Sequence, residues 1–123
     1  MVDALAFLHD LGARALVVYA VLLGLWGTYS YFRHNQVSGS FRSSYLIMAG
    51  LVAAQGLFGA ILFAAGNRPG ELLHVVYGIF AVLFLPGAYV YAHAGPKRRE
   101  AITLAAAAWI VLVAYLRGIG TGG

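Results

Sequence analysis

The segment ELLHVVYGIFAVLFLPGAYVYAH, residues 71–93, is apolar over almost its whole length. About 20 helical residues cross the hydrocarbon core of a bilayer, so this run is long enough to span one. His74 lies near its start and His93 at its end. An imidazole is costly beside lipid and marks a functional position by default. The segment therefore predicts a membrane helix that carries a functional histidine one turn inside.

The composition of the whole chain agrees with a membrane protein. Of 123 residues, 62% are hydrophobic and 10% are charged, whereas soluble domains carry about 25% charged residues. The chain has no cysteine, which excludes disulfides, thiolate metal sites, iron–sulfur clusters and thioether-linked haem. The net charge of +4 comes largely from short loops, where basic residues set membrane orientation. We therefore expect no nucleic-acid partner.

Four apolar segments predict four helices, at about residues 4–33, 44–66, 71–93 and 99–117. Backbone groups in lipid must be paired internally, which favours helices. The connections are short, so consecutive helices should be antiparallel neighbours. We expect one all-α domain over residues 1–118, an integral membrane up-down-up-down four-helix bundle, followed by a flexible C-terminal tail at 118–123.

Basic residues are distributed unevenly between the two ends of this bundle. The end with the loops after the first and third segments carries Arg33, Arg42, Lys97, Arg98 and Arg99. The other end carries Arg14, Arg68 and Arg117, offset by Asp3, Asp10 and Glu71. Because basic loops stay in the cytoplasm, we expect a multi-pass protein of the bacterial inner membrane with both termini outside. The N-terminus lacks a basic region and is expected to be retained.

His9 and His74 should face each other across the bundle. The first and third helices run parallel on the diagonal of such a bundle, and each histidine lies about one turn inside the same membrane face. Two imidazoles at one depth can act as the axial ligands of a single haem iron. We therefore predict a metal site formed by His9 and His74.

Small residues near the two histidines would leave room for a flat macrocycle between the helices. They are Gly12, Ala13, Gly56, Gly59, Gly78 and Ala81. The alternative is plain packing, because small residues are also the usual contact between membrane helices. Both interpretations stay open at this point.

Basic residues at the same end could bind the haem propionates. Arg14 and Arg68 are the candidates, and Arg14 could instead pair with Asp10 or Glu71. Metal-bound histidines usually donate their second ring N–H to an acceptor. We expect Glu71 to accept from His74, and a backbone carbonyl to accept from His9.

The remaining polar and aromatic residues are assigned simpler roles. His34 and His93 lie at the basic end, and a second haem between them is not expected. Gln55 could form a hydrogen bond between helices or touch a quinone carbonyl. An aromatic belt is expected near the basic end, formed by Trp26, Tyr29, Tyr31, Tyr45, Tyr89 and Tyr91.

The chain resembles small four-helix bacterial membrane proteins of the b-type cytochrome plan. The resemblance rests on FLHDLGAR, AGLVAAQGLFGAILF and LLHVVYG, with the basic KRRE that opens the last segment. It implies one non-covalent haem b with His9 and His74 in the axial positions. Two-haem relatives, the ascorbate-reducible type, use two histidine pairs, whereas the second and fourth segments here have no histidine.

These observations favour electron transfer or redox sensing by a membrane cytochrome, an electron carrier rather than an enzyme by itself. The alternative is a haem-free accessory subunit of a respiratory or photosynthetic membrane complex. Expected partners are membrane lipid, other membrane subunits or a second copy, and a quinone or redox protein. Acidic residues occur only near the segment ends, which argues against a proton-coupled transporter. Catalytic motifs such as HExxH or a phosphate loop are absent from the sequence.

Overall fold

Four long helices make up the described part of the chain. The computed structural model describes residues 2–66 and 72–122. The helices are α1 (Val2–His34), α2 (Gly39–Ala64), α3 (Leu72–His93) and α4 (Lys97–Gly122). The prediction of an all-helical, four-helix protein is confirmed. By length and composition, all four helices are able to cross a membrane.

Local sequence signals determine where α1 and α2 begin and end. Asn35 has a positive φ of 53° directly after α1, and Gly66 has a φ of 93° after α2, as is common for residues that end helices. Ser38 caps α2, because its hydroxyl accepts a hydrogen bond from the Phe41 N–H at 3.1 Å. This cap explains why α2 begins at Gly39, five residues before the predicted start.

α4 is longer than predicted. The expected tail at 118–123 was based on its glycines, but α4 continues to Gly122. The carbonyl of Gly118 accepts a hydrogen bond from His74 of α3 at 2.8 Å, so this part of α4 is packed against α3. Packing against a neighbouring helix stabilises the end of α4 as a helix.

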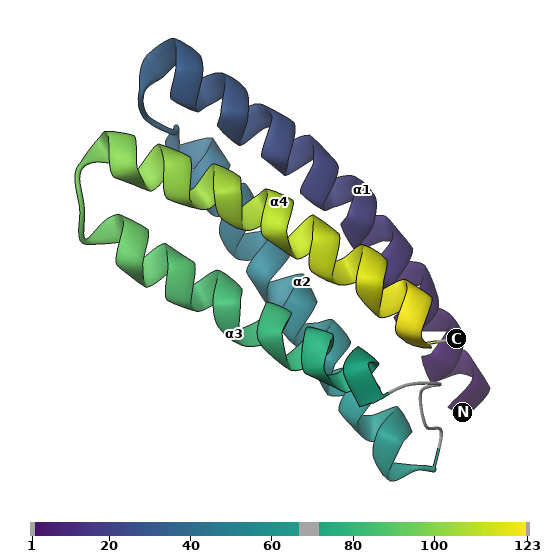
Figure 1. Ribbon diagram of the computed structural model, residues 1–123. Helices are drawn as coiled ribbons and strands as arrows, with labels where there is room; N and C mark the ends of the chain where they lie inside the picture. Colours follow the sequence, from purple (N-terminus) through teal and green to yellow (C-terminus); the bar gives the residue numbers. More distant parts are fainter. Residues whose placement is uncertain (1, 67–71, 123) are drawn as a thin grey trace.

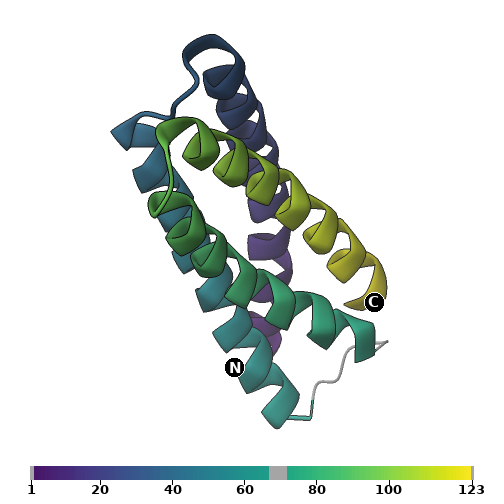
Figure 2. The same ribbon diagram turned by 60° about the vertical axis from the view of Figure 1, so that its left-hand side comes forward.

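The loops after α1 and α3 lie at one end of the molecule, and α1 begins and α4 ends at the other (Figure 1, Figure 2). Near the loop end, the interior is filled by large side chains, among them Phe41, Tyr45, Met48 and Leu85, each fully buried. α4 contributes small side chains to the same core, including Ala101 and Ala108, so that its backbone lies close to its neighbours.

Hydrogen bonds from aromatic side chains also join the helices. Tyr45 donates from its hydroxyl to the Leu85 carbonyl at 2.7 Å, and Trp109 donates from its indole N–H to Thr28 at 2.9 Å. The indole of Trp109 lies against Gly24, where an added Cβ would come within 2.7 Å of a ring carbon. Tyr45 was expected in an interfacial belt, and that expectation is wrong because the side chain is fully buried.

An ion pair joins α2 to α4 at the loop end. Glu100 is buried, and the guanidinium of Arg42 contacts both of its carboxylate oxygens. The shortest of these contacts, from Nη2 to Oε1, is 2.8 Å. His93 of α3 lies 3.7 Å from the second oxygen. The cluster therefore connects three helices where the chain turns.

Candidate functional site

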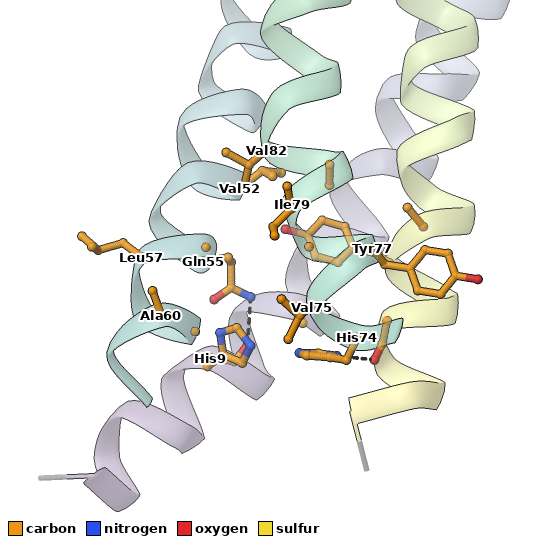
Figure 3. A pocket seen from close by; sticks show the side chains of 18 of the residues that line it. His9, Val52, Gln55, Leu57, Ala60, His74, Val75, Tyr77, Ile79 and Val82 are labelled. Atoms are coloured by element: carbon orange, nitrogen blue, oxygen red, sulfur yellow. Dashed lines mark hydrogen bonds between the residues drawn. The ribbon is translucent and has the colours of Figure 1, made fainter. Parts of the chain in front are cut away.

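A cavity of about 820 Å³ lies among all four helices toward the end that carries the termini. His9 of α1 and His74 of α3 line it, together with apolar residues of α2 and α3 (Figure 3). Leu57, Ile79 and Leu83 line the cavity and are also more than half exposed. The cavity therefore opens sideways between α2 and α3, toward the surface that would face lipid.

The rings of His9 and His74 meet inside this cavity. Their centroids are 6.0 Å apart and their planes are inclined by 71°. The two residues are distant in sequence and lie on different helices, so the fold alone brings them together. The expected encounter of these imidazoles across the bundle is present in the structure.

A backbone carbonyl fixes the ring of His74. Its Nδ1 lies 2.8 Å from the carbonyl oxygen of Gly118 on α4. A carbonyl can only accept, so Nδ1 carries a proton, and in the neutral imidazole Nε2 then has the free lone pair. In Figure 3 the free end of this ring points toward His9. Glu71, the partner predicted for His74, lies outside the described residues.

α2 contacts the ring of His9 on the other side of the cavity. A Cβ added at Gly59 would lie 3.2 Å from the Cε1 atom of this ring, so the imidazole packs directly on the α2 backbone. The Nδ1 atom of His9 is buried and has no hydrogen-bond partner among the described residues. The prediction that a backbone carbonyl accepts from this ring is therefore wrong.

Charged residues lie at the edge of the cavity. Arg14 and Asp10 of α1 both line it, and the Nε atom of Arg14 donates to the Asp10 carboxylate at 3.2 Å. Both side chains are 64% exposed, which leaves the guanidinium accessible for a second anion. Arg68, the other predicted cation, lies outside the described residues.

The predicted small residues fall into two groups. Gly12 and Gly56 are packing positions, because a Cβ there would come within 2.9 Å of Gln55 and of Val82 respectively. Gly78 lines the cavity and has open space where a Cβ would lie. Ala13 and Ala81 also line the cavity. Among the predicted small residues, Gly78 is therefore the glycine whose missing side chain leaves free volume in the cavity.

The other two histidines lie against aromatic side chains. The rings of His34 and Tyr29 pack edge to face, with 5.9 Å between their centroids. The ring of His93 stacks on that of Tyr89, with 5.7 Å between the centroids, and lies near Glu100. Each therefore has a local contact of the kind expected for an interfacial histidine.

Sequence reasoning missed two tyrosines that line the cavity, Tyr77 and Tyr115. Tyr115 precedes Gly118 by three residues, so the two lie on one face of α4. This spacing would have identified Tyr115 as a cavity residue once Gly118 was known to lie beside His74. The described residues contain no group of three or more histidine or acidic side chains able to hold a metal ion.

Comparisons with protein families, with curated proteins and with solved structures give no match. The functional conclusion therefore depends on the geometry of the cavity.

Proposed function

We propose that this protein is a membrane cytochrome that binds one haem b through His9 and His74 and serves in electron transfer or redox sensing. The single observation that carries the proposal is the pair of imidazole rings, with centroids 6.0 Å apart in one cavity. Axial ligation by two histidines is an established way to hold haem iron between helices.

The separation of the rings suits one metal ion between them. An imidazole nitrogen lies about 2 Å from a metal that it binds, and the ring centre lies about 1 Å further back. Two axial rings on one ion therefore have centres about 6 Å apart. The 71° inclination of the rings is compatible, because each ring can rotate about its own metal–nitrogen bond.

The donor set favours a metal carried by a macrocycle over a free ion. Two histidines leave at least half of the coordination positions of a four- or six-coordinate free ion unfilled, and no third histidine or acidic donor joins them among the described residues. A porphyrin supplies four equatorial nitrogens, so two protein ligands complete the sphere. The tautomer of His74 is suitable, since its proton is on the nitrogen that contacts Gly118.

The size and polarity of the cavity also agree with haem. Its α2 wall extends from Val52 to Phe63, a rise of about 16 Å along the helix. The volume of about 820 Å³ is within the usual range for ligand sites. Arg14 of α1, at the edge of the cavity, would receive a propionate, and the apolar wall would enclose the rest of the macrocycle.

We further propose an up-down-up-down arrangement in the bacterial inner membrane, with both termini outside the cytoplasm, since the loop end carries more basic residues. α1 has 33 residues, which makes it about 50 Å long. The hydrocarbon core is about 30 Å thick, so His9 would lie near the outer headgroups. The redox partner would then be a quinone, reached through the side opening, or a redox protein at the outer surface.

A visible absorption spectrum of the detergent-purified protein tests the proposal. We expect a Soret band, and an alpha band that appears when dithionite reduces the sample, because two axial imidazoles give a low-spin haem. Protein that is colourless as purified and retains no added hemin after desalting would contradict it. That result would instead favour the haem-free accessory subunit.

Filling the cavity from α3 provides a second test. In Gly78→Leu, the new side chain would occupy open space inside the cavity, and we expect at least a tenfold loss of haem affinity with little loss of stability. Titration with hemin measures the affinity. The matched control is Gly87→Leu on the same helix. A Cβ at Gly87 also meets open space, but Gly87 does not line the cavity. Equal affinities in the two variants would place the ligand elsewhere.

A further inference from the structure

We infer that Gln55 is a positioning residue that holds His9 opposite His74. Gln55 lies on α2 and is only 6% exposed. Its side-chain Nε2 donates to the backbone carbonyl of His9 at 2.8 Å (Figure 3). This hydrogen bond crosses from α2 to α1 at the level of the cavity.

The bond acts on the residue that carries the ring. A helix carbonyl accepts from the N–H four residues later and has a second lone pair available. Gln55 occupies that second position at His9, so the Cα from which the ring projects is tied to α2. In an apolar environment the amide has no water to compete for this bond. Loss of the bond would free α1 to rotate and carry the ring away from His74.

Two glycines make this attachment possible. A Cβ at Gly12 would lie 2.9 Å from Oε1 of Gln55 and 3.1 Å from Nε2, so the amide fits only because Gly12 has no side chain. Gly59 follows Gln55 by one helical turn and supports the His9 ring, with 3.2 Å between its Cβ position and Cε1. α2 therefore holds His9 at both its backbone and its ring.

This inference rests on the proposed function for its effect on haem. If His9 moves away, one axial ligand is weakened while His74 stays fixed by Gly118. Loss of a residue that orients a metal ligand typically costs 10–100-fold in affinity. The expected signature is a change from a low-spin to a high-spin spectrum together with that loss.

Two variants test the inference from opposite sides of the contact. Gln55→Leu removes the donor, and Gly12→Ala displaces the amide without changing Gln55 itself. We expect both to weaken haem binding 10–100-fold and to broaden and shift the Soret band.

Matched controls separate positioning from general packing. Gly24→Ala on α1 makes a similar clash, with 2.7 Å to Trp109, and Tyr45→Phe removes another buried bond between helices. Both should lower the thermal stability and leave the haem spectrum and affinity unchanged. If Gln55→Leu also lowers stability but leaves the spectrum and affinity unchanged, the inference is overturned.

A measurement without haem keeps the inference testable even if the proposed function fails. In histidine-labelled, haem-free protein, the rings of His9 and His74 are close enough for a nuclear Overhauser contact, given their 6.0 Å centroid separation. We expect Gln55→Leu and Gly12→Ala to abolish that contact and Tyr45→Phe to keep it. Persistence of the contact in Gln55→Leu would overturn the positioning role, whatever the wild-type spectrum shows.

Discussion

Replacement of His74 by alanine is expected to abolish haem retention during purification. His74 is the better oriented of the two proposed ligands, because the carbonyl of Gly118 fixes its ring and its tautomer. Its loss removes the ligand that needs no reorganisation to bind. The ratio of Soret absorbance to protein absorbance should fall at least 100-fold relative to wild type.

His9→Ala should have a smaller effect than His74→Ala. The Nδ1 atom of His9 is buried without a hydrogen-bond partner among the described residues, so the tautomer of this ring is not fixed, whereas that of His74 is fixed by Gly118. We expect weak, five-coordinate, high-spin haem binding to persist through His74. A spectrum of His9→Ala identical to that of wild type would contradict ligation by this pair.

His34→Ala and His93→Ala are the controls for both variants. These rings lie against Tyr29 and Tyr89 near the basic loops, so we expect wild-type haem content. Loss of haem in either control would indicate that the loop end holds the cofactor, and would contradict the assignment to the cavity.

The main features of this architecture follow from apolar runs, which can be read in the sequence. Each run is long enough to cross a bilayer, and short links restrict how consecutive helices can be placed. The depth of a histidine in its run also follows directly, so the encounter of His9 and His74 was predictable. Position along a helix is well determined by sequence because the rise per residue is constant.

The direction in which a side chain points is less predictable when nearly every position is apolar. Tyr45 lies in a region typical of an aromatic belt, but the rotation of α2 directs it into the core. In soluble helices a polar face would have fixed this rotation. Here it is fixed by contacts such as Gln55 with Gly12, which depend on two helices at once.

The backbone acceptor of His74 was also missed by sequence reasoning. We expected an acidic side chain to accept from His74, because side chains can be identified in a sequence. The observed acceptor is the carbonyl of Gly118, a group that every residue possesses. The Gly118 carbonyl lies beside His74 because α4 continues past its predicted end at residue 117 and packs there against α3.

Substitution of Arg42 by methionine is expected to cause the largest loss of stability in the loop end. Glu100 is only 4% exposed, and Arg42 contacts both of its oxygens. Removal of one member of a buried pair leaves an uncompensated charge, at a cost of about 3–5 kcal/mol. The Arg42 side chain is 30% exposed, so water already weakens the pair, and a loss of about 2–3 kcal/mol is the better expectation.

The loss should be measured by reversible unfolding in detergent, with Arg98→Met as the matched control. Arg98 is also basic and forms a hydrogen bond, but its partner is the exposed hydroxyl of Tyr31 at 3.2 Å. We expect a change within about 0.5 kcal/mol there, as for most surface substitutions. If both variants lose a comparable free energy of unfolding, only the net charge of the loop end affects stability, and the specific pair of Arg42 with Glu100 does not.

The double variant Arg42→Met/Glu100→Leu distinguishes a need for the pair from a penalty for breaking it. Apolar replacement of both members removes the stranded carboxylate, and buried ion pairs replaced in this way are often neutral or stabilising. We therefore expect the double variant to recover most of the stability that Arg42→Met loses. If it stays as unstable as Arg42→Met, the attraction between Arg42 and Glu100 is itself what joins α2 to α4, and the loop end depends on that charge pair to bring its helices together.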